Sequence, residues 1–232
     1  MTTSLRLTPA GVVRPLVTTA LVLLVLSTVA RTILHVTGHD VVRGFVPLFA
    51  VTEAGNVPAL FQMMLLGIGA WLLGLTWAAE RGEGGPAGRW LGFACLVALV
   101  AVFTATDLQR WVGALIAPAV LATIPALFTL GWVIPHAIAA VLAMLYLAPL
   151  FKQLGPESRA SLLMAAVLYV TAAVLLDGIR LRLSMAEQWR SVLYTVIVTT
   201  KVTGQMIGSI MLIRGVVARA AERGTGIAVS AT

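Results

Sequence analysis

Residues 191–213 read SVLYTVIVTTKVTGQMIGSIMLI, and this stretch decides the fold class. Its only charged side chain is Lys201. An α-helix needs about 20 mainly apolar residues to cross the hydrocarbon core of a bilayer. The stretch therefore predicts a membrane-spanning helix that carries a lysine inside it.

The composition of the whole chain also indicates a protein that lies in a lipid bilayer. Of its 232 residues, 59% are hydrophobic and 11% are charged, and the mean hydropathy is +0.99. A soluble domain usually carries about 25% charged residues. We therefore expect the lipid bilayer to surround most of the surface, and we expect no soluble domain of any size.

Five further apolar runs are long enough to span a bilayer, and turns rich in glycine, proline or charge separate most of them. The predicted fold class is all-α: a polytopic transmembrane helical bundle that forms a single domain over residues 1–223. Residues 224–232 are expected to form a disordered tail. The six predicted helices cover residues 15–36, 57–79, 90–107, 132–151, 160–179 and 191–213.

The apolar segment 111–130 is the ambiguous part of this scheme. It contains Pro118 and Pro125, and no charged turn separates it from the next helix. Kinked or non-helical backbone at membrane depth must be shielded by protein. We interpret the segment as re-entrant or interfacial, with a seventh helix as the alternative.

The distribution of arginine and lysine favours six helices. With six helices and both termini inside, most Arg and Lys residues lie on the cytoplasmic side, whereas seven helices reverse this bias. The sequence therefore predicts a multipass membrane protein with cytoplasmic N- and C-termini.

The net charge of +7 does not indicate nucleic-acid binding, because the basic residues sit in short loops without interleaved aromatic residues. The chain has one cysteine, Cys95, so neither an intramolecular disulfide nor a cysteine metal cluster is predicted. No nucleotide-binding loop and no metalloprotease or hydrolase motif is present. Whether the protein is an enzyme stays open, as does a homo-oligomeric state.

Lys201 is the residue most in need of an explanation. A lysine at the bilayer centre costs about 2.5–3.5 kcal/mol on insertion scales. Its depth, ten residues into the helix, predicts a position near the midplane with the ammonium directed outward. The predicted topology gathers other polar residues in that outer half. The candidate binding residues are Lys201, Asp177, Asp107, Gln205, Glu53 and His136.

The leading hypothesis is an outward-facing polar cavity that binds or transports a small anionic or carbonyl-bearing ligand, or an ion. The structural alternative is an ion pair of Lys201 with Asp177 or Asp107 that only holds helices together. A third use of the lysine is a Schiff base with an aldehyde such as retinal. An intramembrane hydrolase built on Asp107 and His136 is a further alternative. Gly204 and Gly208 predict close helix packing rather than a ligand site.

Three short segments carry a resemblance that covers residues 49–219. They are Glu53-Ala54-Gly55-Asn56-Val57-Pro58, Trp132-Val133-Ile134-Pro135, and Val198-Thr199 followed by Met206-Ile207-Gly208. In order and spacing they resemble a group of uncharacterised multipass bacterial membrane proteins. The resemblance implies a location in the bacterial cell (inner) membrane. In that group the third helix ends in acidic residues followed by a histidine, and the last helix carries several glutamates. Here Lys201, Val202 and Gln205 stand in place of those glutamates, which implies a cationic site instead of an acidic one.

A lysine in the middle of the last helix is also similar to the microbial rhodopsins. This resemblance implies retinal as the cofactor, with Asp107 or Asp177 as the counterion of the Schiff base. The chain departs from that family at Ile197, where an aspartate is expected one turn before the lysine.

Overall fold

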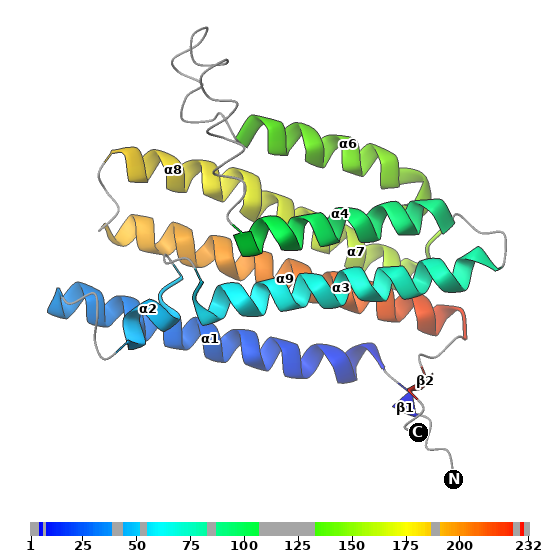
Figure 1. The fold of residues 1–232 in the computed structure, drawn as a ribbon, viewed down its shortest axis with the longest axis horizontal. Coiled ribbons are helices and arrows are strands. Elements are labelled where there is room, and N and C mark those ends of the chain that lie inside the picture. The colour runs from blue at the N-terminus through cyan, green and yellow to red at the C-terminus, as the bar shows by residue number, and fades with distance from the viewer. Residues whose placement is uncertain are drawn as a thin grey trace, which may run out of the picture.

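The computed structural model describes residues 5–6, 8–38, 44–51, 55–82, 87–106, 133–186, 191–224 and 228–229. Within these ranges the chain is almost wholly helical (Figure 1). The helices are α1 (Pro9–Thr37), α2 (Phe45–Phe49), α3 (Val57–Arg81), α4 (Ala87–Thr106), α6 (Val133–Phe151), α7 (Pro156–Val170), the π-helical turn η2 (Thr171–Leu176), α8 (Asp177–Met185) and α9 (Val192–Glu222).

Five stretches of helix are long and apolar enough to cross a membrane. They have 29, 25, 18, 29 and 31 residues, and the fourth runs through α7, η2 and α8 without interruption. Two helices of the described residues lie outside these stretches. α2 has only 5 residues, whereas α6 has 19, which falls within the range of about 17–25 for a spanning helix. The prediction of an all-α multipass membrane protein is confirmed.

The long helices lie alongside one another and alternate in direction (Figure 1). The start of α1 and the end of α9 lie at the same end of the bundle. There the strands β1 (Leu5–Arg6) and β2 (Ala228–Val229) form an antiparallel pair. In the described part of the chain, α4 and α6 run antiparallel, as consecutive helices do in a six-helix arrangement. Segment 111–130 lies outside the described residues.

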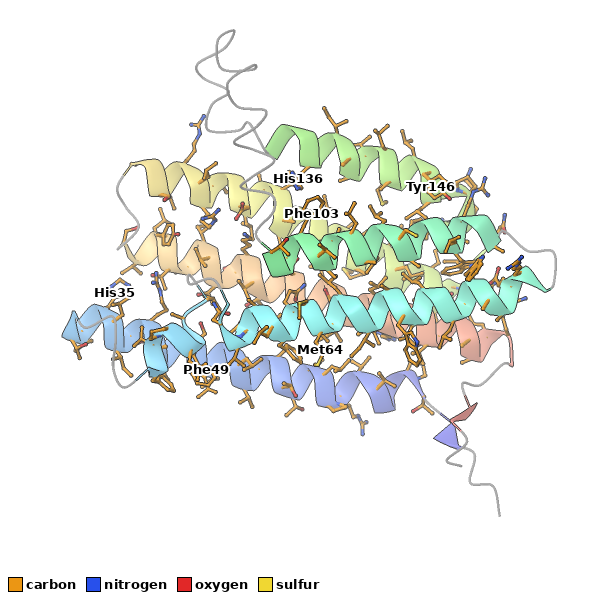
Figure 2. The ribbon with its side chains drawn as sticks, viewed as in Figure 1. His35, Phe49, Met64, Phe103, His136 and Tyr146 are labelled. Atoms are coloured by element: carbon orange, nitrogen blue, oxygen red, sulfur yellow. The ribbon has the colours of Figure 1, made fainter. Side chains whose placement is uncertain are left out.

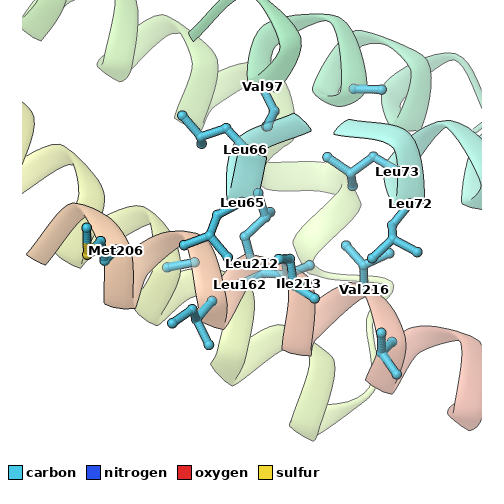
Figure 3. Packing of buried hydrophobic residues seen from close by; sticks show 14 of the residues in the cluster. Leu65, Leu66, Leu72, Leu73, Val97, Leu162, Met206, Leu212, Ile213 and Val216 are labelled. Atoms are coloured by element: carbon cyan, nitrogen blue, oxygen red, sulfur yellow. The ribbon is translucent and has the colours of Figure 1, made fainter. Parts of the chain in front are cut away.

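Helix α9 is the centre of the bundle, because it contacts α1, α3, α7, η2 and α8. Its apolar side chains meet those of α3, α4 and α7 in a continuous core (Figure 3). Large apolar side chains elsewhere, such as Leu21 and Leu145, stay exposed and offer a surface to lipid. The labelled core residues are Leu65, Leu66, Leu72, Leu73, Val97, Leu162, Met206, Leu212, Ile213 and Val216.

Local capping explains where three of the helices begin. Thr8 Oγ1 accepts a hydrogen bond from Gly11 N at 3.2 Å, Asn56 Oδ1 from Ala59 N at 2.7 Å, and Ser191 Oγ from Tyr194 N at 3.1 Å. Each side chain satisfies one backbone donor that the first turn leaves open. Because Thr8 caps α1, this helix starts at Pro9 rather than at residue 15 as predicted.

The last two spanning helices are longer than the sequence predicts. The fifth extends over 156–185 instead of 160–179, and α9 ends at Glu222 instead of 213. The prediction stopped at charged residues, but in the structure several of these side chains form ion pairs and do not end the helix. The other three boundaries, for α3, α4 and α6, differ by at most three residues from the prediction. Within the predicted disordered tail, residues 228–229 form β2.

Candidate functional site

The centre of the candidate site is an ion pair between Asp177 and Lys201. Asp177 is the first residue of α8, and its side chain is fully buried. The Lys201 ammonium donates a hydrogen bond to Asp177 Oδ1. Asp177 and Asp107 were the two acidic partners expected for Lys201, and the structure places Asp177 in contact with it. The contact joins two residues that are 24 positions apart in the chain and lie on different helices, α8 and α9.

Arg180 is the third member of this cluster, and the sequence analysis missed it. Its Nε lies 2.6 Å from Asp177 Oδ1, and its Nη2 lies 3.3 Å from Oδ2. This two-point contact between guanidinium and carboxylate is among the stronger kinds of hydrogen bond in proteins. The signal was the three-residue spacing to Asp177, which puts both side chains on one helix face. It was overlooked because the helix was predicted to end at residue 179.

The turn before Asp177 is π-helical, and it packs against α9. Ala172 in this turn is almost fully buried, and a Cβ placed on Gly204 would lie 3.0 Å from the Ala172 Cβ. Isolated π-helical turns inside α-helices are frequent at functional sites. The close approach of η2 and α9 lets the short aspartate of one helix reach the lysine of the other.

Lys201 lies ten residues after Ser191, the cap of α9, as the sequence predicts, but it is not the central residue of this helix. Its depth in a bilayer stays a prediction. Because α9 continues to Glu222, its central residue is Ile207. At a rise of about 1.5 Å per residue, Lys201 sits roughly 9 Å from that centre. It belongs to the first half of α9, and α9 begins at the end of the bundle opposite the chain termini (Figure 1).

A second polar layer lies deeper along α9. The buried amide of Gln62 donates to Ser209 Oγ at 2.9 Å and to the Gln205 carbonyl at 3.3 Å. Gln205, a candidate binding residue, takes part in this contact through its backbone carbonyl and not through its side chain. Tyr169 of α7 faces Gln62 and Thr104. The sequence signal for Gln62 was a lone amide inside an apolar helix.

Another polar contact lies nearer the end of the bundle where α9 begins. Arg31 of α1 is buried and donates from Nη2 to Thr195 Oγ1 at 3.0 Å. His35 Nε2 lies 3.2 Å from the same hydroxyl. Arg31 thus links α1 to α9.

The structure does not assemble all the predicted site residues. His136 of α6 packs against Phe103 of α4, with ring centroids 6.4 Å apart (Figure 2). Glu53 and Asp107 lie outside the described residues. The proposed pairing of Asp107 with His136 therefore has no described geometry. In the described ranges, no three His, Cys, Asp or Glu side chains are grouped as ligands for a metal ion.

A separate charge cluster joins α3 and α9 at the end where the termini lie. Glu80 is buried, and its Oε1 lies 3.1 Å from Arg219 Nη2 and 3.0 Å from Arg223 Nη1. Nearby, Glu222 accepts hydrogen bonds from Ser158 N at 3.2 Å and Ser158 Oγ at 2.8 Å. These contacts fix the end of α9 to α3 and α7. Glu80 lies one residue beyond the helix predicted over residues 57–79, and in the structure it belongs to α3.

Comparison of the chain with models of protein families, with curated proteins and with solved structures gives no match. The candidate function is therefore argued from the site itself.

Proposed function

We propose that this multipass membrane protein binds a small ligand with an anionic or carbonyl group at Lys201 and Arg180, for binding or transport. The observation that carries the proposal is the exposure of the cluster. The side chain of Asp177 has no exposed surface, whereas 17% of Lys201 and 19% of Arg180 remain exposed. A ligand that approaches the exposed surface of the cluster contacts Lys201 and Arg180 before it reaches the Asp177 carboxylate.

Asp177 has a positioning role in this proposal. Its two oxygens hold an ammonium from α9 and a guanidinium from α8 close together. Charged groups are rare inside membrane helices and usually mark a ligand or ion pathway. Guanidinium and ammonium groups together match the oxygens of a carboxylate or phosphate. The preferred ligand is therefore a small oxyanion or a molecule with a polarised carbonyl.

We further propose that the membrane is the bacterial inner membrane and that both termini are cytoplasmic. The bundle end near the termini carries a concentration of basic residues, whereas α8 carries Arg180 and Arg182 at the other end. Cytoplasmic ends are enriched in Arg and Lys. The basic residues near the termini are Arg14, Arg81, Arg89, Lys152, Arg159, Arg214, Arg219 and Arg223.

Ligand-dependent stability of the purified protein tests the proposed site. Thermal unfolding in detergent is followed by tryptophan fluorescence with chloride, phosphate or acetate as the probe. A ligand at 100 times its Kd stabilises the folded state by about 2.7 kcal/mol. We expect one of these probes to raise the Tm of the native protein and to leave Lys201→Met unchanged.

Arg182→Gln is the matched control, because Arg182 is exposed on the same helix as Arg180. It should keep the full response, and Lys201→Arg should keep part of it because the charge remains. A Tm that rises equally in Lys201→Met, or that rises with none of the probes, counts against the proposal.

A second candidate function is retinal binding, favoured by the contact between Lys201 and Asp177. A protonated Schiff base on the lysine would find a carboxylate counterion already in place. Absorption spectra of membranes with added all-trans-retinal test it. A visible band that is lost in Lys201→Ala supports this candidate, and the absence of a band in the native protein removes it.

A further inference from the structure

A groove lies between α1, α7 and α9. The parts of these helices that line it belong to the end of the bundle where the termini lie (Figure 1). The volume of the groove is about 290 Å³. It is separate from the Lys201 cluster at the other end of α9. The lining residues are Pro9, Ala10, Val13, Arg14, Glu157, Met211 and Arg214.

The charged side chains of the groove favour an anion. Arg14 and Arg214 enter from different helices, and Glu157 is the carboxylate that lies with them. Arg214 Nη2 is 3.2 Å from Glu157 Oε1, with exposed fractions of 39% and 53%. An ion pair this exposed is worth only about 0–1 kcal/mol and opens easily. The guanidinium of Arg14 makes no hydrogen bond or ion pair with any described residue.

The rest of the groove is apolar, and the apolar surface continues along α1. Val13 and Met211 form its wall. From there, Val17, Leu21 and Val25 point outward along α1 with exposed side chains. A soluble anion would use the two arginines only, whereas an amphiphile would also cover this apolar strip.

The depth of the two arginines fits the boundary between headgroups and acyl chains. Helix α1 has 29 residues and α9 has 31, so each is about 45 Å long and exceeds a hydrocarbon core of about 30 Å. Arg14 lies five residues inside the start of α1, and Arg214 lies eight residues inside the end of α9. Both backbones are thus roughly 7–12 Å from their helix ends, near the lipid phosphates.

From these observations we infer that the groove binds the phosphate headgroup of an anionic phospholipid. Arg14 and Arg214 contact the phosphate, and the acyl chains lie along the exposed apolar side chains of α1. Basic pockets between spanning helices are suited to such headgroups. The site is independent of the ligand proposed for Lys201, so either proposal can fail alone.

Native mass spectrometry of the delipidated full-length protein tests the inference. The probes are phosphatidylglycerol and phosphatidylcholine with identical acyl chains, each titrated in detergent. We expect tighter binding of phosphatidylglycerol to the native chain. Arg14→Gln and Arg214→Gln should each weaken this binding roughly fivefold, and the double variant roughly 25-fold.

Two further variants sharpen the test. Glu157→Gln removes the competing carboxylate of the groove, so it should tighten phosphatidylglycerol binding. Arg159→Gln changes the same charge on exposed α7 surface outside the lining of the groove, so it should leave binding unchanged. Far-ultraviolet circular dichroism confirms that each variant keeps its helix content before it is titrated.

Three outcomes would overturn the inference. The first is equal affinity for the two lipids. The second is a double variant that binds phosphatidylglycerol as tightly as Arg159→Gln does. The third is displacement of the lipid by millimolar inorganic phosphate, which would indicate a site for a soluble anion.

Discussion

Asp177 is the residue on which the geometry of the Lys201 cluster depends. It is the shared acceptor for Lys201 and Arg180, and no part of its side chain is exposed. Loss of one partner from a buried ion pair costs more than the pair itself contributes, because a charge stays behind in a poor solvent. We can therefore predict whether the loss of Asp177 or the loss of Lys201 destabilises the protein more.

Asp177→Asn should destabilise the protein more than Lys201→Met does. The asparagine leaves Lys201 and Arg180 side by side without the carboxylate, at a cost of about 3–5 kcal/mol. In Lys201→Met, Asp177 still forms its ion pair with Arg180, so the free energy of unfolding should fall by less. Thermal unfolding in detergent gives the comparison. The double variant should be more stable than Asp177→Asn alone, and a double variant that is less stable would contradict the assignment.

At the scale of helices, the packing of α7 against α9 depends on small residues. A Cβ on Gly208 would lie 3.0 Å from Tyr169 N and 3.1 Å from the Ala165 carbonyl oxygen. These are backbone atoms, so they cannot move aside as a flexible side chain can. The predicted role of Gly208 in close helix packing agrees with this geometry.

Gly208→Ala should therefore lower the free energy of unfolding by about 1–3 kcal/mol, the usual cost of overpacking. Gly67→Ala is the matched control, since a Cβ on Gly67 of α3 meets nothing within 4 Å. It should be neutral or slightly stabilising because alanine favours helix more than glycine does. Equal effects of the two substitutions in chemical or thermal unfolding would show that the α7–α9 contact is loose.

The connection of α3 to α9 through Glu80 gives a second prediction at this scale. Glu80→Gln removes the carboxylate that binds Arg219 and Arg223, so we expect a loss of about 3–5 kcal/mol. Glu157→Gln breaks the exposed pair with Arg214 and should cost at most about 1 kcal/mol. A difference in Tm between these two variants checks the prediction; similar values would mean that Glu80 is better solvated than its burial indicates.

At the scale of the whole molecule, the antiparallel helices bring both termini to one end (Figure 1). We expect tags on the N- and C-terminus to lie on the same side of the membrane, and that side to be the cytoplasm. Protease protection in spheroplasts and in inverted vesicles measures this directly. Tags on opposite sides would require an odd number of crossings and would exclude the arrangement of the described helices.

Much of the fold could be predicted because a membrane-spanning helix can be recognised from its own stretch of sequence. The apolar runs around Leu65 and Ile210 are long enough to identify membrane helices without knowledge of their neighbours. Lys201 stood out for the same reason, as a costly residue within such a run. The helix ends were less predictable, because residues such as Arg219 read as the end of an apolar run until the buried Glu80 is known to receive them.

The sequence by itself determined that this chain is a helical membrane protein with a lysine within its last helix, since hydropathy and length are properties of continuous stretches. Only the tertiary structure decided which groups meet. Asp177 reaches Lys201 through the close packing of η2 on α9, and Glu80 reaches Arg219 over a separation of 139 residues. Such contacts depend on how each helix is rotated toward its neighbours. That rotation is set by the packing of the whole bundle rather than by any one stretch of chain.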